Sequence, residues 1–159
     1  MPVRRIRTGD AAALQRLVSR SSHRSIELRF FGSLKELSDK MALRFAEVDG
    51  KDRFALVALD PDDPDEIVGV VRYAREGDDD GAEYAALIED RFQGRGLGIR
   101  LTKMLIGAAR QNGIAHLYAL VLRENIGMLR LLRSLDLPER MGWQDGAERV
   151  EIDLQSSGT

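Results

Sequence analysis

The stretch EDRFQGRGLG, residues 89–98, contains three glycines, two arginines and a glutamine between an apolar segment and an amphipathic one. Glycine lets the backbone turn sharply and approach a ligand closely. The N-terminus of a following helix supplies unpaired N–H donors and a partial positive charge. The stretch therefore predicts a loop that binds an anion such as a phosphate, and a glycine-rich helix start without a ligand is the plain alternative.

The spacing of the glycines distinguishes between known phosphate-binding loops. A Walker loop needs GxxxxGK[ST], and no lysine or serine stands in that register. A dinucleotide fingerprint starting at Gly94 would need a glycine where Ile99 stands. The remaining pattern is Gln-x-x-Gly-x-Gly, formed by Gln93, Gly96 and Gly98. Four nearby cations could screen a diphosphate, namely Arg91, Arg95, Arg100 and Lys103.

Composition places narrow limits on the class of protein. A chain of 159 residues fits one domain, and we expect it over residues 1–154, with a disordered tail at 155–159. The net charge of −2 argues against nucleic acid as a partner. The chain has no cysteine and only two histidines, without metal-ligand spacing, so we expect no metal site. We find neither a signal peptide nor an apolar run of membrane-spanning length, and we expect a cytoplasmic protein without a membrane partner.

The order of predicted elements indicates the fold class. Helical periodicity and caps predict helices over 8–20, 21–32, 33–50, 98–113 and 124–136. Apolar runs predict strands over 3–6, 53–60, 67–75, 82–90, 115–122 and 146–154. The acidic segments 61–66 and 76–81 predict tight turns, so three consecutive strands form an antiparallel meander. We expect an α/β domain with a mixed sheet, and Trp143 in its core.

These features resemble the GNAT superfamily of N-acetyltransferases over nearly the whole chain. The resemblance rests on the early helices, the meander, QGRGLG (93–98) opening a helix, HLYALVL (116–122) and ENIGMLRLLRSL (124–135). It implies an α/β, GNAT-like fold with a mixed, mainly antiparallel sheet flanked by helices, and acetyl-CoA as co-substrate. Three segments, 26–38, 82–98 and 122–135, are also similar to bacterial protein lysine acetyltransferases, which modify acyl-CoA synthetases. The chain would then acetylate a protein lysine as a monomer or dimer.

The resemblance assigns residues to the co-substrate. In that family the Gln-x-x-Gly-x-Gly loop holds the pyrophosphate of acetyl-CoA, the preceding strand offers backbone groups to the pantetheine arm, and an asparagine begins the later helix beside it. Carried over, the phosphate loop is Gln93, Gly94, Arg95, Gly96, Leu97 and Gly98. The strand residues are Ala86, Leu87 and Ile88, and the helix begins at Asn125.

Glu83 is the expected catalytic residue. An alkyl amine is protonated near neutrality, because its pKa is about 10.4, and a carboxylate can accept that proton before the amine attacks a thioester. Glu83 stands where the resembling protein acetyltransferases have their catalytic glutamate. Its apolar neighbours would partly remove it from water and raise its pKa, whereas an exposed strand-edge glutamate is the plain alternative. Glu89 and Asp90 are rivals, which we expect to face away because they would repel the phosphates.

The sequence departs from the family at the group that protonates the leaving thiolate. Many members carry a tyrosine on the last helix, and Leu132 stands at that position. Asp136 and Leu137 replace the usual Gly-Phe after the helix. We therefore expect the thiolate to leave without a protein acid, since a thiol with a pKa of about 8.5 is a good leaving group. The alternatives are a small-molecule amine acetyltransferase, a non-catalytic acyl-CoA-sensing module and a protein-interaction domain.

Overall fold

The structure is a computed structural model that describes residues 1–22, 37–75, 77, 80–144 and 146–155. The helix expected over 21–32 lies almost entirely outside these residues, as does the start of the one expected over 33–50. His23 and the segment Arg29–Phe31 also lie outside them. Of that second helix the structure describes α3 (Asp39–Ala46), which begins where the Ser38 hydroxyl accepts a hydrogen bond from the backbone N–H of Met41.

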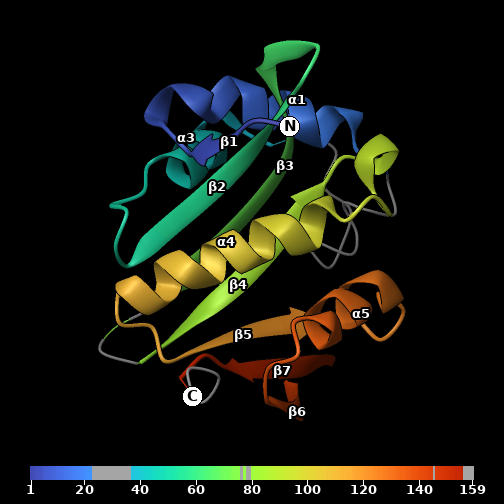
Figure 1. Cartoon of the computed structure of the whole chain (residues 1–159). Coiled ribbons are helices and arrows are strands. Elements are labelled where there is room, and N and C mark those ends of the chain that lie inside the picture. The colour runs from blue at the N-terminus through green and yellow to red at the C-terminus, as the bar shows by residue number, and fades with distance from the viewer. Residues whose placement is uncertain (23–36, 76, 78–79, 145, 156–159) are drawn as a thin grey trace.

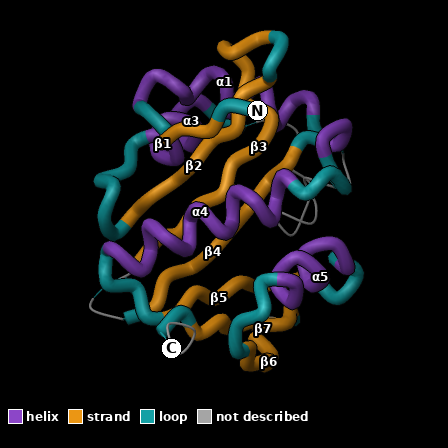
Figure 2. The backbone as a smooth tube through the Cα atoms, viewed as in Figure 1, coloured by secondary structure: helices purple, strands orange, loops and turns teal. Residues whose placement is uncertain are grey.

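The remaining elements follow the predicted order closely (Figures 1 and 2). The first half contains β1 (Val3–Arg5), η1 (Thr8–Asp10), α1 (Ala11–Arg20), β2 (Arg53–Asp60), β3 (Asp63–Arg75) and β4 (Gly81–Ile88). The second half contains η2 (Asp90–Phe92), α4 (Leu97–Gln111), β5 (His116–Val121), α5 (Ile126–Ser134), β6 (Glu139–Gln144) and β7 (Ala147–Asp153). Helices and strands are interspersed along one chain, as expected for an α/β protein.

The described strands form one seven-stranded sheet in the order β1-β2-β3-β4-β5-β7-β6. Strands β2, β3 and β4 make the predicted antiparallel meander. β4 and β5 are parallel, whereas the other neighbouring pairs are antiparallel. The expected mixed, mainly antiparallel sheet is therefore confirmed.

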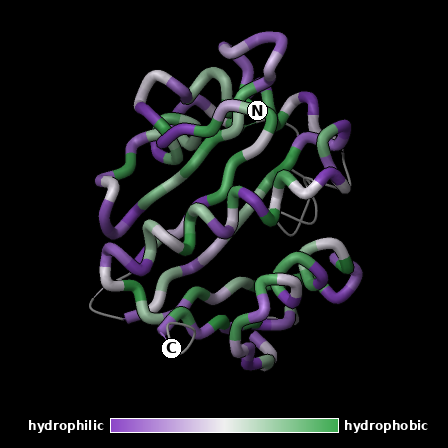
Figure 3. Tube along the Cα trace, viewed as in Figure 1, coloured by the Kyte–Doolittle hydropathy of each residue, from purple (hydrophilic) through white to green (hydrophobic). Residues whose placement is uncertain are grey.

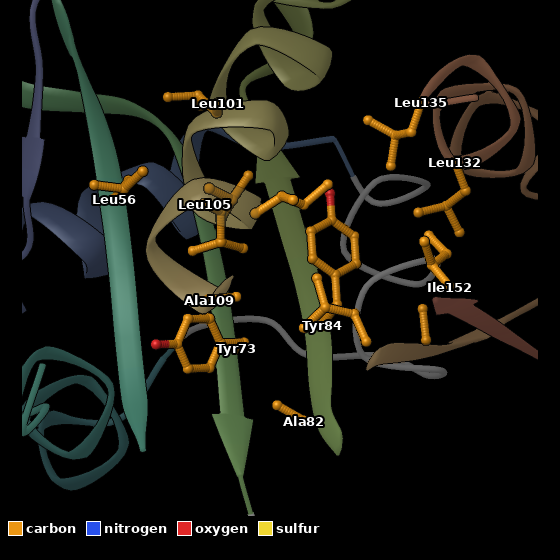
Figure 4. Close-up of a cluster of buried hydrophobic side chains, with 14 of the residues drawn as sticks. Leu56, Tyr73, Ala82, Tyr84, Leu101, Leu105, Ala109, Leu132, Leu135 and Ile152 are labelled. Carbon is orange, nitrogen blue, oxygen red and sulfur yellow. The ribbon is translucent and has the colours of Figure 1, made fainter. Parts of the chain in front are cut away.

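Helices cover both faces of this sheet (Figure 1). α1 buries an apolar stripe of Ala13, Leu14, Leu17 and Val18, and packs with α3 against residues of β2, β3 and β4. α4 packs on the opposite face, where the cluster of Figure 4 joins Leu101 and Leu105 of α4 to Tyr84 of the sheet. Figure 3 shows apolar residues concentrated along β2 and β3, which are buried between the two layers. The core therefore fixes the sheet from both sides.

Three details differ from the predictions. The turn expected over 61–66 is short, because β3 already begins at Asp63. β6 was not predicted, and it forms an edge strand in which every residue is exposed. Trp143 lies on this edge with 58% of its surface exposed, so its expected place in the core is wrong. A strand with a neighbour on one side only leaves backbone groups unpaired along its free edge, and the exposure of the β6 side chains depends on which elements cover the sheet faces there.

Candidate active site

The site begins where the parallel strands β4 and β5 separate. Their pairing covers three residue pairs, Gly81↔His116, Ala82↔Leu117 and Glu83↔Tyr118. Beyond Glu83 the two strands diverge (Figure 1), while β4 stays paired with β3 through Ile88. The sheet is therefore open on the β5 side of β4, while the hydrogen bonds between β4 and β3 continue.

A cleft of about 560 Å³ occupies this opening. It is lined by three groups of residues: Glu83–Ile88 of β4, Ala119–Val121 of β5, and residues of the glycine loop and α5. Of the residues predicted to bind the co-substrate, the cleft brings together Ala86, Leu87, Ile88, Gln93, Gly94, Gly96, Gly98 and Asn125. Arg95 and Leu97 are not among the described lining residues.

The alternation of hydrogen-bonded and non-hydrogen-bonded residues along β4 shows which of its backbone groups face the cleft. The N–H of Glu89 donates to the carbonyl of Val68 at 2.8 Å. Since antiparallel pairs alternate between bonded and non-bonded, Leu87 directs its N–H and C=O toward Val70 of β3. Ala86 and Ile88 then direct theirs to the opposite edge, where β5 has diverged. Leu87 was expected, together with Ala86 and Ile88, to offer backbone groups to the co-substrate, but its N–H and C=O point toward β3 instead.

The glycine loop is held in an unusual backbone conformation at two positions. Gly94 has φ +74° and Gly96 has φ +79°, in the left-handed region that favours glycine. A Cβ atom built on either residue would meet no heavy atom within 4 Å, so the loop has open space beside it. Gly96 is also the N-cap of the 15-residue helix α4. Backbone N–H groups at such a turn can bind an anion.

Gln93, Arg95 and Leu97 have other contacts. The Gln93 Nε2 donates to the carbonyl of Ile88 at 2.9 Å, which fastens the loop to the end of β4. The guanidinium of Arg95 lies 5.7 Å from the ring centroid of Phe92. Leu97 is buried in the core beneath α4. The side chains of Gln93 and Leu97 therefore shape the loop, whereas exposed Arg95 is its cation.

Asn125 begins α5 as predicted. Its Oδ1 accepts a hydrogen bond from the backbone N–H of Met128 at 3.1 Å, which caps the helix. The face of α5 that follows contributes Gly127, Met128, Arg130, Leu131 and Ser134 to the cleft. This face was not predicted as part of the site, although its spacing of three and four residues is typical of one side of a helix.

Glu83 lines the cleft at the point where β4 and β5 stop pairing, and its side chain is exposed. The expected partial burial of this carboxylate is therefore wrong. Alternation puts Glu83 on the same face as Leu87, which packs with α1 and α3. The side chain thus faces the side of the sheet opposite α4.

Tyr84, which was not predicted either, forms the floor of the cleft. Its hydroxyl lies 2.7 Å from the Oγ1 of buried Thr102, which in turn donates to the carbonyl of Gly98 at 2.7 Å. Figure 4 shows the Tyr84 ring between Leu105 of α4 and Leu132 of α5. These bonds tie β4 to the first turn of α4. Leu132 is itself buried, so the position of the missing tyrosine acid is part of the core.

Glu89 and Asp90 face away from the cleft, as expected. Glu89 is buried and pairs with Arg20 and Arg91, and the Oδ1 of Asp90 accepts a hydrogen bond from the backbone N–H of Ser22. Within the described residues, no group of three or more histidine, aspartate or glutamate side chains is arranged to hold a metal ion. No helix in the described part of the chain has the length and apolarity to cross a membrane.

Comparison with known proteins defines the class. A family model described as the acetyltransferase (GNAT) domain matches residues 2–137. Acetyltransferase PA5475 of Pseudomonas aeruginosa is 31% identical over 151 residues, which cover 94% of this chain and 80% of that protein. The protein is therefore an acetyltransferase by class. The chain belongs to the GNAT acetyltransferase family.

Solved structures agree with this assignment. The GNAT domain of S. lividans PAT is 33% identical and superposes with a TM-score of 0.87, covering 95% of this chain and 89% of that one. A phosphinothricin acetyltransferase from Sinorhizobium meliloti, in complex with AcCoA, is 16% identical with a TM-score of 0.75, covering 99% and 91%. The second likeness concerns the fold alone.

Proposed function

We propose that this protein transfers the acetyl group of acetyl-CoA to an amine, with a protein lysine as the acceptor. The observation that carries the proposal is the position of Glu83. It is the last β4 residue paired with β5, and it lines the same cleft as the glycine loop. A carboxylate and a loop suited to an anion therefore line one opening.

The residues of the cleft fit an extended thioester co-substrate. The loop offers N–H groups around Gly94 and Gly96 with open space beside them, which suits a pyrophosphate. Ala86 and Ile88 direct backbone groups into the opening, which suits the amides of a pantetheine arm. Exposed Arg95 and cleft-lining Arg130 supply cations, and neither forms an ion pair with an acidic side chain among the described residues. The complex of the S. meliloti relative supports the same co-substrate for this fold.

Glu83 acts as the general base. An amine with a pKa of about 10.4 reaches the site protonated, and Glu83 accepts its proton directly or through a water. The nitrogen then attacks the thioester carbonyl directly, a C–N bond forms, and the C–S bond breaks. The sulfur leaves as thiolate without a dedicated acid, and the extra proton on the attacking nitrogen passes to solvent or to that thiolate. No cysteine exists to form an acyl-enzyme, so both substrates are bound together when transfer occurs.

The sheet surface around Glu83 favours a large acceptor such as a protein. Tyr118 lies directly opposite Glu83 in the ladder, and Glu151 of β7 lies opposite Tyr118. Among the described residues, the cluster that contains α1 and α3 takes its strand residues from β2, β3 and β4 and includes none from β5 or β7. Likeness to the S. lividans PAT domain favours a protein lysine. An acyl-CoA synthetase is the acceptor that the resemblance suggests first.

Labelled acetyl-CoA tests the proposal. Wild type, Glu83→Gln and the control Glu47→Gln, an exposed glutamate after α3, are incubated with a proteome array and with a panel of small amines. We expect acetyl-lysine on a restricted set of proteins, lost by roughly 100-fold in Glu83→Gln and unchanged in the control. Acetylation of small amines alone would instead indicate a small-molecule enzyme. Tight acetyl-CoA binding without transfer to any acceptor would identify a sensing module.

A further inference from the structure

The four cations near the glycine loop are not equivalent. Arg91, Arg95, Arg100 and Lys103 were all expected to screen a diphosphate. The structure commits Arg91 elsewhere: its Nε donates to Glu89 Oε1 at 2.8 Å, and its NH2 group donates to Asp60 Oδ2 at 2.8 Å. Its guanidinium also lies 4.7 Å from the ring centroid of Phe92. A guanidinium fixed on two carboxylates and a ring is oriented by the protein.

Arg91 belongs to a series of alternating charges, which we name the ion-pair chain. Its members in spatial order are Arg16, Glu66, Arg20, Glu89, Arg91 and Asp60. The contacts measure 2.7, 2.6, 3.4, 2.8 and 2.8 Å. The ion-pair chain joins α1, β3, the residue after β4, η2 and the end of β2. It therefore connects the start of the loop to three other elements of the fold.

The carboxylates of the ion-pair chain are placed for this task. Glu89 is only 5% exposed and directly follows β4, where the loop begins. A carboxylate so buried is costly unless it is paired, and Glu89 has Arg20 on one side and Arg91 on the other. Asp60 is also buried, and its Oδ1 accepts a hydrogen bond from the N–H of Asp62. Asp60, which binds Arg91, thus accepts hydrogen bonds from a backbone N–H as well as from the Arg91 side chain.

Phe92 transmits this anchoring to the cleft. It follows Arg91, is buried in the core and lines the cleft. The N–H of Phe92 donates to the carbonyl of Glu89, and the N–H of Gln93 donates to the carbonyl of Asp90. The turn of η2 is therefore fixed between the ion-pair chain and the glycines that follow.

We propose that Arg91 is a positioning residue for the glycine loop, and that Asp60 and Glu89 act through it, so that these two carboxylates strengthen the binding of the anionic co-substrate. This inference rests on the proposed function. It opposes the expectation from charge alone, because negative groups near a phosphate site repel the ligand. Neutralising Asp60 or Glu89 should weaken binding if the groups position the loop, and should strengthen it if they act by charge.

The test compares the affinity for acetyl-CoA in wild type, Arg91→Ala, Asp60→Asn and Glu89→Gln by calorimetry. Asp62→Asn is the matched control, since it makes the same charge change two residues away at an exposed position. We expect each of the three variants to raise the Kd roughly tenfold and to raise KM for acetyl-CoA with little change in kcat. The control should leave the Kd unchanged or lower it. Arg91→Ala combined with Asp60→Asn should be no weaker than Arg91→Ala alone.

Hydrogen exchange of the free protein gives a second readout. Amides of residues 93–98 should exchange faster in Asp60→Asn, which is nearly isosteric and preserves the fold, than in Asp62→Asn. A Kd that stays constant or falls in Asp60→Asn, with unchanged exchange of the loop, overturns the inference and leaves the proposed function intact. Failure of wild type to bind acetyl-CoA overturns the proposed function, and exchange of the loop still decides whether Arg91 positions it.

Discussion

Gly98 lies against Leu131 so closely that a Cβ atom on Gly98 would be 2.9 Å from Leu131 Cδ1. Gly98 is in the first turn of α4, and Leu131 is on the face of α5 that lines the cleft. The backbone φ of Gly98 is not positive, unlike those of Gly94 and Gly96. Gly98 therefore lies in close contact with a helix side chain, whereas Gly94 and Gly96 adopt the backbone conformation that favours glycine.

The contact predicts a sign change in a double-mutant cycle. Gly98→Ala should lower the free energy of unfolding by about 1 kcal/mol in wild type, because overpacking outweighs the gain in helix propensity. In a Leu131→Ala background the same change should raise it by about 1 kcal/mol, because the space is free. Urea unfolding of the four proteins measures the coupling. Equal effects in both backgrounds would contradict the contact.

The left-handed glycines predict a joint loss of stability and affinity. Gly94→Ala and Gly96→Ala should each cost roughly 1 kcal/mol of unfolding free energy, since alanine disfavours positive φ, and each should raise the Kd for acetyl-CoA. Gly107→Ala is the matched control, because Gly107 is exposed within α4 with no heavy atom within 4 Å of a built Cβ. It should stabilise the protein by about 1 kcal/mol without changing the Kd. Unchanged affinity in the two loop variants would remove the glycines from the binding site.

At Asp136, two residues past the end of α5, we expect a substitution by glycine to stabilise the protein. Asp136 has φ +58°, the left-handed conformation usual for glycine one position past a helix C-cap. Asp136→Gly should therefore raise the free energy of unfolding by about 1 kcal/mol. Asp136→Ala should lower it, because alanine tolerates this conformation less well than aspartate. Thermal and urea unfolding test the ranking Gly, Asp, Ala, and any other order refutes it.

Asp10 predicts acid sensitivity. Burial alone would raise its pKa, but hydrogen bonds from the Arg4 guanidinium at 2.7 and 2.8 Å and from the N–H of Arg7 outweigh burial and lower it. A lowered pKa gives stability that is complete above the ordinary value of about 3.9 and is lost as the pH falls through the folded-state value.

Asp10→Asn should therefore cost about 2 kcal/mol at pH 7. Its difference from wild type should shrink as the pH falls below about 3.9, because the unfolded chain then takes up a proton that the folded carboxylate still resists. Urea unfolding at pH 7 and pH 3 measures this. Asp65→Asn, an exposed aspartate in β3, should show little difference at either pH. A gap between Asp10→Asn and wild type that persists at pH 3 would exclude the carboxylate as its cause.

Much of the fold was predictable because its signals are local. The stripe of α1, the cap at Asn125 and the meander β2–β3–β4 depend on periodicity, on one side chain or on short turns. β6 was missed because an exposed edge strand lacks an apolar run. Met141 and Trp143 at alternate positions and the Asp-Gly dipeptide at 145–146 were the available signals. Met104 of α4 is 44% exposed, whereas Ile106 and Ala109 of the same helix are buried.

For the site, the sequence by itself determined the register of the loop, the glycines at 94 and 96, the cap at Asn125 and a carboxylate at the head of β4. These depend on backbone torsion and on spacing along one segment. Only the tertiary structure decided which groups meet. It left Glu83 exposed at the separation of β4 and β5, turned Leu87 toward β3, and brought Arg20, Asp60 and Glu89 around Arg91. Burial, hydrogen-bond phase and ion pairing between distant segments arise only when the chain is folded.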